Sequence, residues 1–148
     1  MKTAIIADDH QIVRQIVRRI LEKELGLQVI GEACDGHEAT RLVSERRPDI
    51  LVTDMKMPGA SGTEVTRWVR SLSPATRVIV YSIYDDPGYV YGALEAGASG
   101  YVLKKSSPDN LICAIKEVIL DRKYLDPAVS RAAIESYQQQ ADKPPLSW

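Results

Sequence analysis

The chain has 148 residues, of which 45% are hydrophobic and 26% charged, as expected of one globular domain with room for only a short appendage. Its 19 basic and 20 acidic residues give a formal net charge of −1, so no field over the whole chain attracts nucleic acid or an anionic membrane. This charge balance argues against DNA binding by this chain itself, although a local basic face is not excluded.

The cysteines and the apolar runs indicate in which cellular compartment the protein is expected to function. Cys34 and Cys113 lie in no CxxC pair and have no histidine at metal-ligand spacing, so we expect buried free thiols in a reducing environment. No apolar run approaches the roughly 20 residues of a membrane span. Asp8 and Asp9 interrupt the N-terminal apolar run too early for a secretion signal. The sequence therefore predicts a cytoplasmic protein with no membrane partner.

Short apolar segments alternate with segments of helical periodicity along the chain. Five strands are expected at Thr3–Ala7, Leu27–Ala33, Ile50–Thr53, Arg77–Ser82 and Gly100–Leu103. Five helices are expected at 12–25, 37–47, 63–72, 85–97 and 107–121. This alternation predicts right-handed crossovers and a parallel sheet, and strands without a polar face predict helices on both sides. The expected architecture is a three-layer α/β/α sandwich.

Two helices carry specific expectations about their buried faces. In the first, apolar residues at 12, 13, 16, 17, 20, 21 and 25 predict one continuous buried stripe that ends before Gly26. In the third, Val65, Trp68, Val69 and Leu72 are expected to face inward.

The C-terminal segment differs in composition. Asp126-Pro127 is a helix-start signal, and the apolar positions up to Tyr137 have helical spacing. Gln138-Gln139-Gln140 and Lys143-Pro144-Pro145 are typical of a linker. We therefore expect one domain over 1–123, followed by a helix and a linker over 124–148.

Polar residues follow four of the five predicted strands. Asp8 and Asp9 follow the first, Asp54 the third and Lys104 the fifth, while Ser82 ends the fourth. In an open α/β sheet, ligands bind at the carboxyl ends of the strands. Converging carboxylates repel one another, and Mg²⁺ or Mn²⁺ would compensate their charge. A cation, an ammonium and a hydroxyl suit a phosphoryl group, and a carboxylate beside them can serve as the nucleophile.

These residues, together with Pro58-Gly59 and Tyr101, resemble the receiver domain of two-component response regulators over about residues 1 to 121. The segments Ala7-Asp8-Asp9-His10 and Tyr124-Leu125-Asp126-Pro127 are most similar to the branch with a C-terminal LuxR-type helix-turn-helix output domain. The resemblance implies a flavodoxin-like, CheY-like fold with strand order 2-1-3-4-5. It also implies a signalling domain rather than an enzyme, one that catalyses only its own phosphorylation and dephosphorylation.

The resemblance also implies a role for each site residue. Asp54 would accept the phosphoryl group from a sensor histidine kinase. Asp9, Asp54 and the backbone carbonyl of Lys56 would bind Mg²⁺ directly, with Asp8 acting through water. Lys104 would pair with the phosphoryl group, and Ser82 and Tyr101 would form the switch. Phosphorylation would then change conformation or dimerisation and so control transcription through an output domain absent from these 148 residues.

The residues flanking the expected phosphoryl site depart from the family pattern. Ile83 stands where a small residue is often found, and Lys56 and Tyr84 lie on either side. Bulky side chains there would hinder the attacking water, so these three residues are expected to modulate the rate and lengthen the phosphoryl lifetime.

Plainer roles remain open at each position. Asp8 and Asp9 could cap the first helix, Asp54 could be an ordinary loop carboxylate, and Ser82 a plain strand-end hydroxyl. Lys105 could take the role of Lys104, and Tyr101 could be static core. At the level of function, a stand-alone receiver acting through protein contacts is the main alternative. A haloacid-dehalogenase-type phosphatase fits less well, because Lys56 stands where its second aspartate would be.

Overall fold

Six short segments form strands in the part of the chain that the computed structural model describes, residues 1–129. The strands are β1 (Thr3–Ala7), β2 (Gln28–Ala33), β3 (Ile50–Thr53), β4 (Arg77–Ser82), β5 (Gly100–Leu103) and β6 (Tyr124–Leu125). The helices are α1 (Gln11–Arg19), which continues as the π-helical turn η1 (Ile20–Glu24), α2 (Gly36–Arg46), α3 (Gly62–Leu72), α4 (Pro87–Glu95) and α5 (Pro108–Ile119). No helix in this range is both long enough and apolar enough to cross a membrane.

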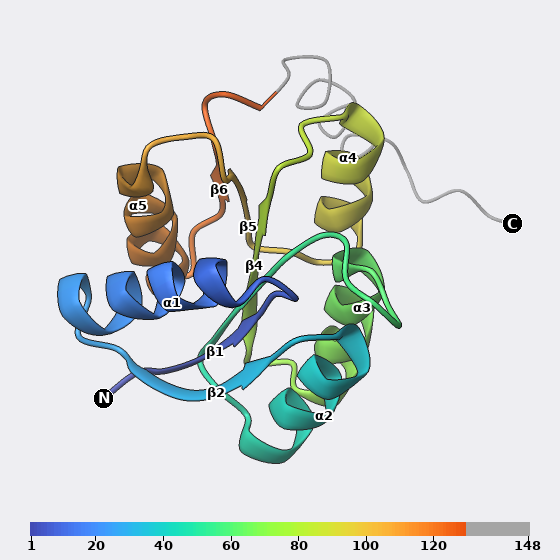
Figure 1. The fold of residues 1–148 in the computed structure, drawn as a ribbon. Helices are drawn as coiled ribbons and strands as arrows, with labels where there is room; N and C mark the ends of the chain where they lie inside the picture. Colours follow the sequence, from blue (N-terminus) through green and yellow to red (C-terminus); the bar gives the residue numbers. More distant parts are fainter. Residues whose placement is uncertain (130–148) are drawn as a thin grey trace, which may run out of the picture.

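The strands form one sheet in the order β2-β1-β3-β4-β5-β6, and every neighbouring pair is parallel. Helices α1 and α5 cover one face of this sheet, and α2, α3 and α4 cover the other (Figure 1). The predicted three-layer sandwich and the strand order 2-1-3-4-5 are confirmed, with β6 as an addition at the edge.

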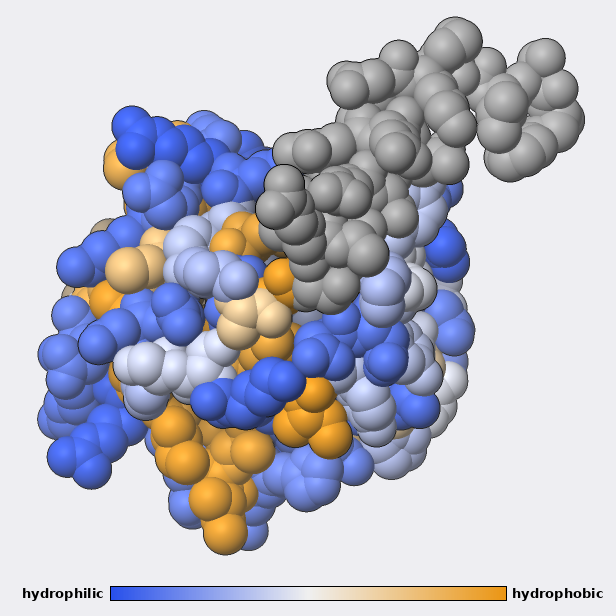
Figure 2. All heavy atoms as spheres, turned by 90° about the horizontal axis from the view of Figure 1, so that it is seen from above, coloured by the Kyte–Doolittle hydropathy of each residue, from blue (hydrophilic) through white to orange (hydrophobic). Residues whose placement is uncertain are grey.

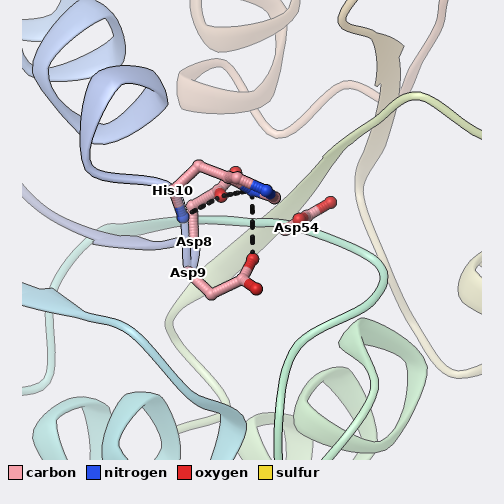
Figure 3. A group of neighbouring side chains, drawn as sticks. All are labelled: Asp8, Asp9, His10 and Asp54. Atoms are coloured by element: carbon pink, nitrogen blue, oxygen red, sulfur yellow. Dashed lines mark hydrogen bonds and ion pairs between the residues drawn. The ribbon is translucent and has the colours of Figure 1, made fainter.

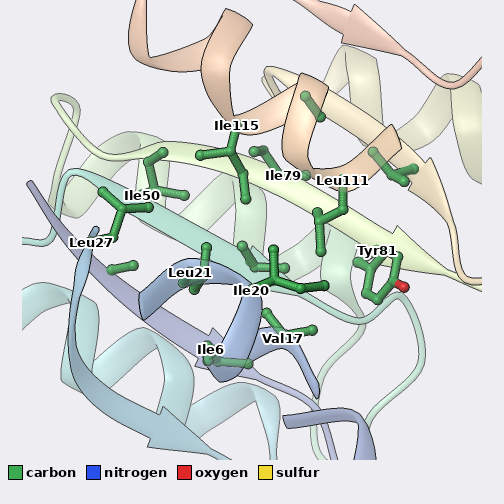
Figure 4. Packing of buried hydrophobic residues seen from close by; sticks show 14 of the residues in the cluster. Ile6, Val17, Ile20, Leu21, Leu27, Ile50, Ile79, Tyr81, Leu111 and Ile115 are labelled. Carbon is green, nitrogen blue, oxygen red and sulfur yellow. The ribbon is translucent and has the colours of Figure 1, made fainter. Parts of the chain in front are cut away.

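The strands alternate their side chains between two apolar cores, as the pleat requires. Ile6 points to the α1 and α5 side, where it packs in one cluster with Leu21 and Ile115 (Figure 4). Its neighbour Ile5 points to the opposite side and packs with Val65 of α3. Because both faces are buried, the central positions of β1, β3, β4 and β5 are apolar, and the polar residues of these strands stand at their ends.

The stripe predicted for the first helix is wrong at its start. Ile12 and Ile16 are 71% and 50% exposed. Val17, Ile20 and Leu21 are buried, Val13 and Leu25 are partly buried, and the helix widens into η1 from Ile20. The π turn changes the phase of the side chains, so a constant helical period does not describe the whole segment. On the face that Figure 2 presents, apolar side chains reach the surface in patches.

Three more side-chain predictions are wrong. Leu72, in the last turn of α3, is 45% exposed rather than inward-facing. Cys34 and Cys113 are exposed rather than buried. Cys34 lies just past the end of β2, in the loop that follows the strand. Cys113 lies on α5, but it is not on the buried face of that helix, which Leu111, Ala114, Ile115 and Val118 form.

The chain beyond α5 begins with a strand that the sequence reading did not anticipate. Tyr124 pairs with Gly100 and Leu125 with Tyr101, which extends the sheet past the boundary expected at residue 123. Asp126 to Val129 then form a turn. The helix expected up to Tyr137 and the linker after it lie outside the described residues, and the domain boundary stays a prediction.

Candidate functional site

Three carboxylates meet at the carboxyl edge of the sheet. Asp8 follows β1 and Asp54 follows β3, and they are only 2% and 5% exposed. The Asp8 and Asp54 amides donate to the Ala33 and Ala7 carbonyls at 3.0 and 2.8 Å, so the ladder of hydrogen bonds continues past the strand ends. Each of Asp8, Asp9, His10 and Asp54 offers one ligand atom, and these atoms lie within 4.8 Å of one another (Figure 3).

Lys104 supplies the positive charge at this edge. Its Nζ lies 2.7 Å from Asp8 Oδ2 and 3.4 Å from Asp54 Oδ2, with a side chain only 14% exposed. Lys105, the alternative kept open from the sequence, turns away and pairs with Asp85 at 3.0 Å on the surface. The structure therefore brings Lys104, and not Lys105, into contact with the carboxylates.

Asp54 is held with its two oxygens in different environments. The Met55 amide donates to Asp54 Oδ1 at 2.8 Å, whereas Oδ2 faces the Lys104 ammonium. Burial raises the pKa of Asp54, and the negative charge of Asp8 adds to that rise, while Lys104 and the Met55 amide oppose it. The ionised site is therefore strained electrostatically, and further positive charge would relieve it.

A close approach of glycine fixes the loop after β3. A Cβ added to Gly62 would lie 2.4 Å from the Asp54 carbonyl oxygen, and the Gly62 amide donates to the Met55 carbonyl at 2.6 Å. Only a residue without a side chain fits there. The loop can thus close against the Asp54 backbone, which leaves the Asp54 side chain at the carboxyl edge of the sheet.

The strain at Asp54 predicts that Asp54→Asn is more stable than the wild type at neutral pH, by about 1 kcal/mol. The folded-state pKa of Asp54 lies above its ordinary value of 3.8, so protonation favours folding. The wild type therefore loses stability as the pH rises through that raised pKa, and the variant does not. Urea unfolding in the presence of a chelator measures this, and the gap between the two should close below pH 3.8.

A gap that stayed constant between pH 3 and 8, or that favoured the wild type at pH 7, would contradict this account of Asp54. Asp109→Asn, which removes an exposed carboxyl at the start of α5, is the matched control for the loss of one negative charge.

Two neighbours of the carboxylates were missed as partners. His10 Nδ1 lies 3.1 Å from Asp8 Oδ1 and 3.2 Å from Asp9 Oδ1. Arg14 donates to the Asp8 backbone carbonyl at 2.7 Å and so fixes the chain at the end of β1. The position of His10 directly after Asp8 and Asp9 could have indicated its contact with them. Nothing in the sequence indicates that Arg14, one turn into the first helix, contacts Asp8.

The residues present fit a divalent cation. Carboxylate oxygens are the ligands that Mg²⁺ and Mn²⁺ prefer, and here they converge from the ends of two strands in a cluster whose negative charge Lys104 only partly balances. Lys56, whose backbone carbonyl was expected to be a further ligand, lies in the same loop as Asp54. Its ammonium lies over the Tyr84 and Tyr89 rings, 4.8 and 5.2 Å from their centroids.

Ser82 and Tyr101 are both fully buried and both contact the backbone of Tyr84. Ser82 Oγ accepts a hydrogen bond from the Tyr84 amide at 2.9 Å, and the Tyr101 hydroxyl donates to the Tyr84 carbonyl at 2.6 Å. Burial raises the pKa of Tyr101 to about 12. The Tyr101 ring is fully buried and so points inward in this structure. Ile83, which was expected to hinder the attacking water, is instead 61% exposed.

Comparisons with known proteins place these observations in a family. The pattern of the family described as the response regulator receiver domain matches residues 4–116. The transcriptional regulatory protein DegU of Brevibacillus brevis is 40% identical over 135 residues, which cover 91% of this chain and 57% of DegU. The chain thus spans little more than half the length of that relative.

Solved structures agree with the sequence comparison. A two-component response regulator of the LuxR family from Aurantimonas sp. SI85-9A1 superposes with a TM-score of 0.82 and 35% identity, over 95% of this chain and 98% of that one. RcsB from Salmonella enterica serovar Typhimurium, solved bound to a promoter in the presence of a phosphomimetic, has a TM-score of 0.82 and 26% identity. That similarity covers 98% of this chain and 72% of RcsB.

Proposed function

This chain belongs to the response regulator receiver domain family, and from that premise we propose that it accepts a phosphoryl group on Asp54 from a sensor histidine kinase. The observation that supports this most directly is the buried Asp54 carboxylate, whose Oδ2 faces Lys104 at 3.4 Å within a cluster of acidic ligands. The family is one of signalling domains rather than enzymes that turn over an external substrate.

Asp54 Oδ2 is the proposed nucleophile, because Oδ1 already accepts the Met55 amide hydrogen bond. In the transfer, an oxygen–phosphorus bond forms at Asp54 as the nitrogen–phosphorus bond of the kinase phosphohistidine breaks. The histidine nitrogen keeps the electron pair and takes up a proton. Asp8, Asp9, Asp54 and the Lys56 carbonyl would hold Mg²⁺, which would neutralise charge on the phosphoryl oxygens when bound.

Lys104 and Ser82 are the proposed donors to the phosphoryl oxygens. The Lys104 ammonium already lies between the Asp8 and Asp54 carboxylates, and it would exchange part of this pairing for the new anion. Ser82 and Tyr101 share the Tyr84 backbone as a partner, so a movement of the hydroxyl toward the phosphoryl group would be felt at the ring. This pair is the proposed two-state element of the domain.

The test of this function is incubation of the chain with acetyl phosphate and Mg²⁺, read by intact mass. A gain of one phosphoryl group that a chelator abolishes is the expected result. Turnover of a general phosphate ester, without a stable adduct, would instead favour the phosphatase class.

Aromatic residues beside the site are expected to slow the loss of the phosphoryl group. Tyr84 packs on Tyr89 with ring centroids 5.1 Å apart, and Lys56 lies over both rings, so this cluster would restrict the path of the attacking water. Tyr84→Ala should lose the phosphoryl group several-fold faster in a dephosphorylation time course, with a smaller effect for the exposed Ile83→Ala. Unchanged decay in Tyr84→Ala would contradict the proposal.

We further propose that phosphorylation controls transcription through an output domain outside these 148 residues, with a homodimer as the active form. The relatives support this, since DegU is a transcriptional regulatory protein and RcsB was solved bound to a promoter. Size measurement of the chain before and after phosphorylation tests the dimer. DNA binding has to be tested with the longer protein.

A further inference from the structure

The turn after β6 carries a buried carboxylate that the proposed function leaves without a role. Asp126 is 0% exposed, although it lies only one residue beyond the last strand. Burying a carboxylate is costly unless hydrogen bonds compensate it. Its two oxygens accept from two backbone amides: Oδ2 from Leu103 and Oδ1 from Ala128, each at 2.9 Å.

The bond to Leu103 replaces a missing part of the sheet. Strand β6 pairs with β5 only as far as Leu125 opposite Tyr101, and the chain then turns at Pro127. Leu103 is completely buried, so its amide would have no water to bond to if the edge of β5 stayed open here. The Asp126 side chain takes the place that a backbone carbonyl of β6 would have filled.

This contact is next to the lysine of the site. Leu103 directly precedes Lys104, whose own amide donates to the Ser82 carbonyl of β4 at 2.8 Å. Asp126 therefore fixes the end of β5 from one side while Ser82 fixes it from the other. The Lys104 side chain leaves the backbone from this doubly held end and reaches Asp8 and Asp54.

The same segment also contacts the proposed switch residue. The Asp126 amide donates to the Tyr101 carbonyl at 2.9 Å, and Val129, 4% exposed, belongs to the apolar cluster that contains Tyr101. We name residues 124–129 the strap. The strap thus contacts the backbone of β5 beside both Tyr101 and Lys104.

We infer that Asp126 is a positioning residue for phosphoryl transfer, acting through Leu103 to hold Lys104 against Asp54. This inference rests on the proposed function. It makes the strap, which leads toward the C-terminal segment, part of the machinery of the site. By reciprocity, anything that shifts the strap would shift the affinity of the site for a phosphoryl group.

A double-mutant cycle with acetyl phosphate and Mg²⁺ tests this inference in the full chain. Asp126→Asn puts an amide nitrogen against one of the two backbone donors, and we expect it to slow phosphorylation about tenfold. In the Lys104→Ala background, the same substitution should change the rate by less than about twofold, because the residue it positions is gone. Asp109→Asn is the matched control and should leave the rate unchanged in both backgrounds.

A purely structural role predicts a different pattern. If Asp126→Asn slows phosphorylation equally in both backgrounds, or not at all in the wild-type background, the inference is overturned while phosphorylation of the wild type still upholds the proposed function. If the wild type takes up no phosphoryl group, the proposed function fails first, and the inference with it.

Hydrogen exchange of the wild type covers the case in which Asp126→Asn does not fold. With beryllium fluoride and Mg²⁺ as the probe, the Leu103 amide should exchange about tenfold more slowly than in their absence. The Arg77 amide, which donates to the Asp49 carbonyl at the start of β4, at the opposite end of the strand from Ser82 and outside the strap, is the internal control. Equal exchange of Leu103 with and without the probe overturns the inference.

Discussion

Replacing Asp54 by alanine is expected to abolish phosphorylation of the chain by acetyl phosphate. Asp54 is the buried carboxylate whose Oδ2 faces Lys104 while its other oxygen is bound to the backbone. Asp8 is also buried, but its Oδ1 accepts from the His10 amide, and its Oδ2 is held closer to the Lys104 ammonium, at 2.7 Å against 3.4 Å for Asp54 Oδ2. Intact mass after incubation with Mg²⁺ should therefore show one phosphoryl group on the wild type and none on Asp54→Ala.

The control for this experiment is Asp86→Ala. Asp86 precedes α4 and makes no side-chain capping bond, so its loss should leave the yield of phosphorylated chain unchanged. A phosphoryl group retained by Asp54→Ala at the wild-type rate would show that another residue is the acceptor. Because alanine also removes the electrostatic strain at this position, the variant should remain folded, and a loss of signal will not reflect unfolding.

Replacing Lys104 by alanine is expected to lower the phosphorylation rate about a hundredfold, the usual effect of removing one preorganised charge from such a site. It should also destabilise the chain by about 3 kcal/mol in the absence of metal, because Asp8 and Asp54 lose their shared counter-charge while remaining buried. Rates with acetyl phosphate and urea unfolding in a chelator measure the two effects. Mg²⁺ should restore part of the lost stability, since it supplies positive charge to the same carboxylates.

Lys105→Ala is the matched control for Lys104→Ala, because it removes the same kind of side chain from the next residue. Lys105 forms a surface ion pair with Asp85, and water screens such exposed pairs so that they contribute little to stability. Phosphorylation of Lys105→Ala should stay within about twofold of the wild type. If Lys105→Ala were the slower variant, the assignment of Lys104 to the site would be wrong.

Much of the fold could be predicted because it depends on local periodicity. Five of the six strands were located to within a residue or two, since continuous apolar runs bounded by turn residues leave few alternatives. Strand β6 was missed because two residues, Tyr124 and Leu125, form no pattern of their own and pair only because the edge of β5 is available. The exposed Ile12 and Ile16 were missed for a related reason, because the width of a buried stripe depends on what packs against it.

The site was predictable for a topological reason. In a parallel sheet all strands end at the same edge, so polar residues that follow the strands converge wherever they lie in the chain. This places Asp8, Asp54 and Lys104 together from sequence positions alone, although Asp8 and Lys104 are 96 residues apart. The resemblance to receiver domains then supplied roles that spacing could not.

The sequence by itself determined which residue types stand at the strand ends, because the helical and strand periods can be read locally. Only the tertiary structure decided how they share their charges: Lys104 turns inward and Lys105 outward, and Asp54 holds Oδ1 on the Met55 amide while Oδ2 faces Lys104. It also decided that Asp126, expected to start a helix, closes the edge of β5 beside Lys104. These outcomes depend on burial and on distances between distant segments, which exist only once the crossovers have brought the strands side by side.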